Sequence, residues 1–405
     1  MIRHIVTLAV CLCIGLVPAR AQDLTAVARV DAQASQIKDG WFGKTNVTLH
    51  LSQGVPFRVF TLADPPRLVI DFRDVDWSGV HASDLLEGSS GLTNVRFGNF
   101  QPGWSRLVAD MAHPMLPLEI AMNLNRSAGT AVLSFTLEKT EADDFFARSG
   151  APKDALWPPP QKEEIVAPLV DDRFVVAIDP GHGGVDPGAE RDNINEKELM
   201  LQFAFELREA LLRSDVSDVV LTRESDVFVS LEGRVARAHQ AGADVFLSLH
   251  ADALSEGDAE GATIYTLSAR ASDTATAHLA ARHHRSDIIA GTDLTGSDDE
   301  VASVLLDLAR QETEPRSKAL AASLVKGMTE AGGPMNRRPL REAGFSVLKS
   351  ADIPSVLVEV GFLSSARDLD NLRDPTWRAG IIGGMVQAIA GWRDADAAKR
   401  PLVRQ

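Results

Sequence analysis

Hydrophobic and polar residues alternate along short runs in the first third of the chain. The period of two is seen over residues 47–52, 68–72 and 133–137, and it places alternate side chains on opposite faces of a strand. Gly- and Pro-rich turn sequences separate these runs. The pattern predicts a small all-β sandwich over residues 26–138.

From about residue 173 the pattern changes to continuous hydrophobic runs separated by segments of helical periodicity. The expected strands are 174–178, 219–221, 245–249, 262–267 and 356–360. The expected helices are 199–212, 231–241, 317–331 and 376–392. This alternation predicts an α/β domain over residues 173–395, with a mostly parallel sheet flanked by helices on both faces. Sheets of this kind place their sites at the carboxyl ends of the strands.

The segment between these two regions, residues 139–172, follows neither pattern. It contains five prolines, mixed charges and few hydrophobic residues, which is typical of a semi-stiff, extended linker. Phe145, Phe146 and Trp157 leave open the alternative that part of it packs on a neighbouring domain.

The first residues have the features of a secretory signal peptide. A basic start, a hydrophobic run over 5–17 and small residues at 19–21 predict that residues 1–21 are cleaved. The run is too short to span a bilayer of about 30 Å as a helix, although an uncleaved anchor or a buried helix is the alternative. Cys11 and Cys13 are the only cysteines, so the mature chain would have no disulfide and no thiol nucleophile. We expect an exported protein without a transmembrane segment.

Composition and charge narrow the possible partners. The 405 residues include 45% hydrophobic and 24% charged side chains, and the formal net charge is −15. Such an acidic chain is not expected to bind nucleic acid, because that affinity comes largely from neutralising phosphates with Lys and Arg. Within the sandwich, we assign Arg58, Arg67 and Arg73 to solvated strand faces, with contact to a glycan or a protein as the alternative.

Four polar residues lie at or near strand ends in the predicted α/β domain. They are His182, Glu196, His250 and Glu359. Two histidines and a carboxylate are a known ligand set for catalytic zinc, but a histidine at a strand end is often structural, and the helix dipole alone accounts for Glu196. Glu359 is harder to explain structurally, because a buried, unpaired carboxylate costs several (~3–5) kcal/mol. The spacing alone therefore leaves a zinc site and purely structural roles both open.

Several motifs, in order along the chain, resemble those of the zinc-dependent N-acetylmuramoyl-L-alanine amidases that act in cell separation. They are IDPGHGGVDPGA at 178–189, NEKELML, VVLTRESD, LEGRVARA, DVFLSLHAD and GFSVLKSADIPSVLVEVGFLSS. Within the predicted sandwich, GVPFRVFTLADPPRLVIDF is similar to the AMIN domain that precedes such amidases and helps to place them on the cell wall at division sites.

The resemblance implies roles for the four polar residues. In the family, the residues that correspond to His182, Glu196 and His250 bind Zn²⁺, and the residue that corresponds to Glu359 is the catalytic acid/base. The implied substrate is peptidoglycan, cut between N-acetylmuramic acid and L-alanine. The implied location is the periplasm of a bacterium with two membranes, and we expect a monomer.

Residues 268–315 form a long insertion, because simple connections in α/β units take about 2–6 residues. Val301, Val304, Leu305 and Leu308 have helical spacing. The resemblance implies that the insert blocks the zinc until an activator of the degenerate LytM type displaces it; the alternative is a helix that merely packs on the sheet. His278 and Glu300 are candidates to cap the metal. His283 and His284 are adjacent, so on a helix they point apart and make a poor ligand pair.

Two other functions stay open on the residues alone. One is a wall-binding adaptor without turnover, which the presence of all four polar residues argues against. The other is a different zinc hydrolase, such as a sugar deacetylase or a carboxypeptidase on wall peptides. Only the motif resemblance favours an amidase over another zinc hydrolase.

Overall fold

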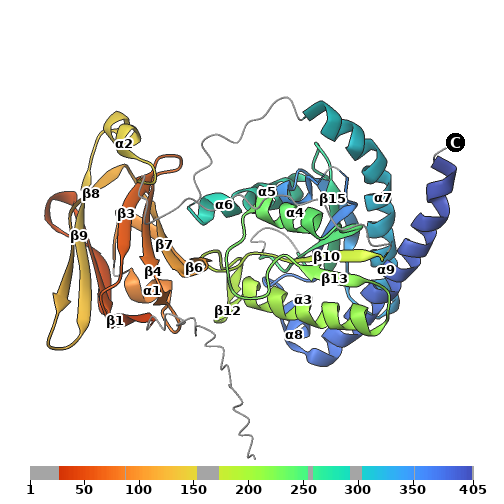
Figure 1. Ribbon diagram of the computed structural model, residues 1–405, viewed down its shortest axis with the longest axis horizontal. Helices are drawn as coiled ribbons and strands as arrows, with labels where there is room; N and C mark the ends of the chain where they lie inside the picture. Colours follow the sequence, from red (N-terminus) through yellow and green to blue (C-terminus); the bar gives the residue numbers. More distant parts are fainter. Residues whose placement is uncertain are drawn as a thin grey trace, which may run out of the picture.

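The chain forms a β-sandwich followed by an α/β unit (Figure 1). The computed structural model describes residues 27–86, 88–152, 173–253, 259–291, 303–350 and 352–403. The predicted signal peptide therefore lies outside the described residues. Among the helices described, none is both long and apolar enough to cross a bilayer.

Two sheets make up the sandwich, as the alternation predicted. One has the order β5-β1-β2-β9-β8 and consists of β1 (Ala28–Asp39), β2 (Thr45–Leu51), β5 (Val75–Asp76), β8 (Met115–Asn125) and β9 (Thr130–Lys139). The other has the order β3-β4-β7-β6 and consists of β3 (Phe57–Leu62), β4 (Arg67–Arg73), β6 (Leu92–Gln101) and β7 (Trp104–Met111). The short helix α1 (Ala82–Leu85) lies beside β1 and β6. The neighbouring strands pair antiparallel except β1 with β5.

The period of two sets the core of the sandwich. On β2, Val47 pairs with Phe135 and Leu49 with Leu133 of β9, and all four are buried. Strand β4 differs because both of its faces are buried, including the polar one that carries Arg67. The assignment of Arg67 to a solvated face is therefore wrong. The α/β unit covers that face, which the alternation within the strand could not reveal.

The α/β unit is built on a six-stranded sheet of order β13-β10-β14-β17-β15-β16. Its strands are β10 (Val175–Pro180), β13 (Asp218–Leu221), β14 (Val245–His250), β15 (Ala262–Leu267), β16 (Met335–Ala343) and β17 (Ser355–Glu359). The first four strands in this order are parallel, and β15 runs antiparallel to β17. The sheet is mostly parallel, as predicted.

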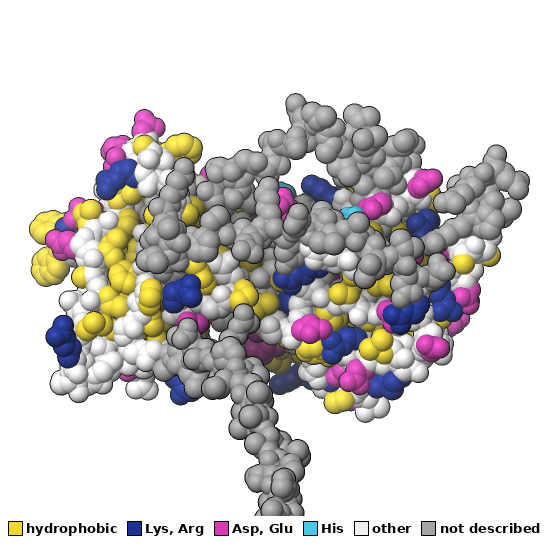
Figure 2. Space-filling model, in the orientation of Figure 1, with side chains coloured by type: hydrophobic (Ala, Val, Ile, Leu, Met, Phe, Trp, Pro, Cys, Tyr) yellow, Lys and Arg dark blue, Asp and Glu magenta, His cyan; other side chains and the backbone are white. Residues whose placement is uncertain are grey.

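Helices cover both faces of this sheet because its strands are apolar on both sides. One face packs against α3 (Glu196–Arg213), α7 (Ser303–Glu330) and α9 (Pro375–Val403), with α8 (Ala366–Arg373) at the edge of that layer. The opposite face packs against α4 (Leu231–Gln240), α5 (Thr274–His284) and the 3₁₀ turn η3 (Ser346–Leu348). Figure 2 shows acidic and basic side chains interspersed over the visible face of this unit.

The predicted linker and the predicted insert each differ in part from the expectation. The predicted linker begins with helix α2 (Ala142–Arg148), where Phe145 packs into the sandwich core and Phe146 is exposed; residues 153–172, with Trp157, are outside the described part. The predicted end of the insert also differs, because α7 runs continuously through Pro315. The first part of the insert forms α5 and the short α6 (Ser286–Ile289).

Candidate metal centre

A network of buried charges shapes the loop that follows β10. Asp179 accepts hydrogen bonds from Thr222 Oγ1 at 2.5 Å, Arg234 Nη1 at 2.7 Å and Ser248 Oγ at 2.7 Å. Arg234 also donates to the carbonyl oxygens of Pro180 and His182. The motif arginine and threonine therefore help to hold the loop that carries His182 in place.

Two glycines let the ligand-bearing segments approach one another. A Cβ on Gly181 would lie 2.3 Å from the His250 ring, and a Cβ on Gly188 would lie 2.7 Å from His182 and 2.8 Å from Glu196. His182 itself adopts a left-handed backbone, with φ +59°, a conformation uncommon for residues other than glycine. The Gly-rich sequence thus allows a crowded cluster of side chains.

The three residues predicted to bind metal converge from three segments. Glu196 is the first residue of α3, and its Oε1 lies 3.0 Å from His250 Nδ1 at the end of β14. Its Oε2 lies 3.2 Å from His182 Nε2. One ligand atom from each of the three lies within 4.8 Å of the others. His182 points its Nδ1 away from this group, 2.9 Å from Asp186 Oδ2, so Asp186 orients the ring as a carboxylate partner often does for a metal-bound histidine.

Glu359 lies beside this group because of strand register. In the parallel pair of β14 and β17, His250 is the partner of Glu359. The carboxylate is completely buried, and its Oε2 accepts a hydrogen bond from the amide of Asp252 at 2.9 Å. Of the buried side-chain atoms described, Glu359 Oε1 and His182 Nε2 are among those without a hydrogen-bond partner. Buried polar atoms are rarely left unpaired, so both are available to a ligand.

The environment shifts the pKa values of the cluster in opposite directions. Burial lowers the pKa of His182, but the carboxylates of Asp186 and Glu196 outweigh burial and raise it well above its ordinary value. Burial raises the pKa of Glu196, but His182 and His250 hold it well below the usual range. Burial and the neighbouring His283 lower the pKa of His250 to about 4. Burial, reinforced by Asp252 and Glu196, raises the pKa of Glu359 well above the usual range. The site thus holds one carboxylate that stays ionised and one that readily takes a proton.

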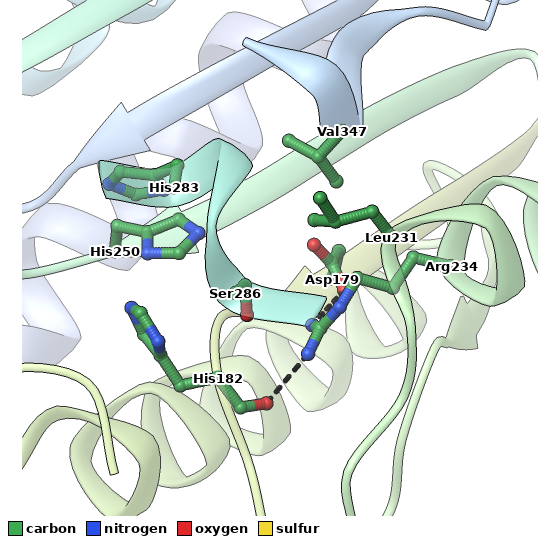
Figure 3. A pocket seen from close by; sticks show the side chains of 8 residues that line it. All are labelled: Asp179, His182, Leu231, Arg234, His250, His283, Ser286 and Val347. Carbon is green, nitrogen blue, oxygen red and sulfur yellow. Dashed lines mark hydrogen bonds and ion pairs between the residues drawn. The ribbon is translucent and has the colours of Figure 1, made fainter. Parts of the chain in front are cut away.

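A fifth residue, His283, reaches the site from the insert (Figure 3). Its ring centre lies 4.2 Å from that of His250, and its Nε2 lies 3.7 Å from Glu359 Oε1. His250, His283 and Glu359 form a second group whose ligand atoms lie within 4.8 Å of one another. His284 points elsewhere and bonds Ser346 Oγ at 2.6 Å, so the expectation that the adjacent histidines point apart is consistent with the structure. One of the pair nevertheless enters the site.

The other candidate caps are not found in the site. His278 is exposed on α5, and Glu300 lies outside the described residues.

Two residues of the site, Asp186 and Ser286, were not predicted from the sequence. In the structure, Ser286 Oγ donates a hydrogen bond to Asp186 Oδ2 at 2.6 Å. Asp186 could have been found, since it follows His182 by four residues in the same motif. Nothing in the sequence pattern indicated Ser286. The site residues line a small pocket together with neighbouring side chains: Asp179, His182, Leu231, Arg234, His250, His283, Ser286 and Val347.

The donor set suits a divalent cation such as zinc. Imidazole nitrogens are borderline ligands and carboxylate oxygens are hard ones, and zinc binds both kinds with tetrahedral geometry. The unpaired Nε2 of His182 faces Glu196 without hydrogen-bond geometry, as expected if a cation belongs between them. The cluster can therefore hold a metal ion next to a carboxylate that exchanges protons.

Comparison with known proteins agrees with this chemistry. The sequence profile of an N-acetylmuramoyl-L-alanine amidase family matches residues 176–391, and that of the AMIN domain matches residues 36–130. The chain is 28% identical to N-acetylmuramoyl-L-alanine amidase AmiC of Escherichia coli, over 86% of each chain. It is 36% identical to AmiA of Escherichia coli over 54% of this chain and 75% of that protein. It is also 28% identical to AmiC of Neisseria meningitidis over 88% of each.

Proposed function

The chain belongs to the N-acetylmuramoyl-L-alanine amidase family, and from this premise we propose that it hydrolyses the amide bond between N-acetylmuramic acid and L-alanine in peptidoglycan. The observation that carries the proposal is the convergence of His182, Glu196 and His250 beside the buried carboxylate of Glu359. The proposed catalytic domain is residues 173–395, and residues 26–138 are the proposed AMIN-type targeting domain.

His182, Glu196 and His250 would hold a zinc ion. A bound zinc ion would supply Lewis acidity, which polarises an amide carbonyl and makes water acidic enough to ionise near neutral pH. Asp186 fixes the His182 ring by bonding Nδ1, so that Nε2 faces the cluster. The backbone amides of Ala189 and Ala251 hold the Glu196 oxygens in place at 2.9 Å each.

Glu359 is the proposed acid/base. It would accept a proton from the water whose oxygen attacks the amide carbonyl, and then deliver that proton to the nitrogen as the C–N bond breaks. The raised pKa of Glu359 makes its carboxylate a better base toward the attacking water, and the proton it then carries can pass to the amide nitrogen, which becomes basic as the C–N bond breaks. The bond from the Asp252 amide leaves Oε1 as the oxygen that exchanges the proton.

The insert is proposed to keep the enzyme inactive. His283 places its ring against His250 and its Nε2 near Glu359, where a substrate carbonyl and the attacking water would have to fit. The cap of the site is thus proposed to be His283, not His278. A degenerate LytM-type protein that displaces α5 and α6 is the proposed activator. We further propose a periplasmic monomer exported by the signal peptide.

Product analysis tests the reaction. The purified full chain should release peptides that begin with L-alanine from muropeptides, as seen by mass spectrometry, and the release should stop when a chelator is added and resume with zinc. Freed acetate would instead indicate a sugar deacetylase, and freed single amino acids would indicate a carboxypeptidase. Binding to wall sacculi without any product would support the adaptor.

A further inference from the structure

The last turn of the insert is held by arginines of the sandwich. Arg67 Nη1 donates to the carbonyl oxygen of Ile288 at 2.5 Å, and Arg96 Nε donates to that of Ile289 at 3.3 Å. Arg106 Nη1 donates to the carbonyl oxygens of Ala290 and Gly291 at 3.2 and 2.7 Å. Four consecutive carbonyls at the end of α6 therefore have guanidinium partners from the other unit.

These carbonyls lie at or just after the C-terminal end of α6, where partners within the helix run out, although that of Ile288 also accepts the Gly291 amide at 2.9 Å. The last carbonyls of a helix lack partners within it and carry the negative end of its dipole. Cationic donors at this end are favourable, and hydrogen bonds to charged groups are stronger than neutral ones. The arginine face of β4, β6 and β7 thus fits the chemistry of this one turn.

Carboxylates of the sandwich fix two of these arginines in place. Asp71 accepts two hydrogen bonds from Arg106, at 2.6 and 3.0 Å, and Asp110 accepts two from Arg96, at 2.7 and 3.0 Å. The Arg106 guanidinium also lies 3.6 Å from the centre of the Phe100 ring. Because the donors are already oriented, little side-chain entropy is lost when the insert docks.

A small apolar cluster and two backbone hydrogen bonds complete the interface between the sandwich and the α/β unit. Ala290 packs in a buried cluster with Phe100, Val108, Val185 and Phe228, and the Phe100 and Phe228 rings stack with centres 5.7 Å apart. The carbonyl of Asn99 accepts hydrogen bonds from the amides of Val185 and Phe228, at 3.2 and 3.3 Å. The sandwich thus contacts both the insert and the loop that carries His182.

We propose that this face of the sandwich is the docking surface that keeps the insert over the catalytic site. Only four residues lie between His283, which enters the site, and Ile288, which the sandwich holds. An insert anchored at this turn cannot swing away from the site without breaking the arginine contacts. The inference rests on the proposed autoinhibition, and it assigns the sandwich a second role besides targeting.

A glycine in the insert offers a direct test, made in the full zinc-loaded chain. Gly291 has φ +68°, and a Cβ there would lie 3.1 Å from Val108 and 3.2 Å from Val69. Gly291→Val should displace the turn at residues 288–291 from the sheet that contains β4 and β7. Gly332→Val is the matched control, because Gly332 also follows a helix by two residues and has φ +81°, yet a Cβ there would meet nothing within 4 Å.

Hydrogen–deuterium exchange reads the docking without relying on activity. In Gly291→Val the amides of Ile289 and Ala290, which bond Arg285 and Ser286, should exchange at least about tenfold faster, as expected when several charge-assisted hydrogen bonds are lost. Gly332→Val should leave these amides unchanged. Equal exchange in wild type and Gly291→Val, or equal acceleration in both variants, would overturn the docking proposal.

Arginine substitution tests the same surface from the other side. Arg67→Met keeps much of the buried stem but removes the donor to Ile288, and it should accelerate exchange over 286–291 and raise basal amidase activity several-fold. Arg29→Met, on the opposite sheet and largely exposed, is the control. A thermal melt of each variant checks that the sandwich is folded. If Arg67→Met melts as wild type and shows neither change, the proposal is wrong.

The two proposals fail in different ways. If His283→Ala activates the enzyme while Gly291→Val leaves exchange and activity unchanged, autoinhibition stands and the docking role of the sandwich is overturned. If Gly291→Val loosens the insert but neither variant activates the enzyme, the sandwich does hold the insert, but the insert does not inhibit.

Discussion

Two clusters of buried charge lie on either side of the insert, and they differ in how their polar atoms are satisfied. In the sandwich cluster, Arg67, Arg96 and Arg106 have backbone carbonyls or carboxylates as partners. In the cluster around Glu196, the described atoms His182 Nε2, His283 Nε2 and Glu359 Oε1 have no hydrogen-bond partner. The insert joins the two, with His283 in one and its terminal carbonyls in the other.

The difference indicates what each cluster does. Buried charges are costly unless they are paired, so a cluster completed by the chain's own atoms holds two parts of the fold together. A cluster that leaves aligned polar atoms unpaired at a strand edge is typical of a site that takes a ligand from outside. Pairing, more than the number of charges, separates the structural cluster from the proposed catalytic one.

Metal removal has the largest expected effect. It should act on the cluster around Glu196 and not on the arginine cluster of the sandwich. Chelation should abolish hydrolysis and lower the melting temperature of the α/β unit, because a ligand bound only by the folded state stabilises it. Added zinc should restore both. Activity that persists at full chelation, checked by metal analysis of the same sample, would contradict the metal role of the cluster.

Replacement of the acid/base should remove the chemistry and keep the metal. Glu359→Gln can still accept the bond from the Asp252 amide, so folding and zinc content should stay near wild type, while turnover of muropeptides falls by about 10²–10⁴-fold. Glu224→Gln, on the surface and paired with Arg208, serves as the control. Near-normal turnover by Glu359→Gln would refute the assignment.

Replacement of Asp186, which orients the proposed metal ligand His182, should have a smaller effect. Asp186→Asn removes the charge beside His182 Nδ1 and should weaken zinc affinity by about 10–100-fold. Competition with a fluorescent chelator measures this affinity. Asp192→Asn, exposed beyond the same loop, should bind zinc as the wild type does.

The smallest expected effect is a gain of activity. His283→Ala should raise basal turnover several-fold by opening the space beside His250 and Glu359. His284→Ala removes the adjacent ring, which bonds Ser346 outside the site, and it should have no effect. Initial rates without any activator protein distinguish the two variants, and equal rates would argue against a cap at His283.

The local pattern predicted those parts of the fold that depend on local sequence. Alternation in 47–52 and 133–137 identified β2 and β9, because one face of each meets the sandwich core. The motif around His182 pointed to a cluster with Glu196 and His250, and the structure does bring these side chains together.

Other features depend on contacts between segments far apart in the chain. Arg67 is buried and donates a hydrogen bond to a carbonyl 221 residues away, which no local pattern reveals. The place of His283 follows from how the insert folds back over the sheet. Helix α7 passes through Pro315 although proline in a helix interior removes a hydrogen bond, so the expected start of this helix at residue 317 was wrong.

The contact between Asn99 and the loop that carries His182 has a practical consequence for truncated versions of this enzyme. An excised α/β half would leave the amides of Val185 and Phe228 without their Asn99 acceptor, and it would bare the Phe228 ring to water. Such a fragment would expose an apolar patch beside the proposed catalytic site, and patches of this kind promote aggregation. A truncated reagent for digesting cell walls would therefore need a polar replacement at Phe228 to remain dispersed.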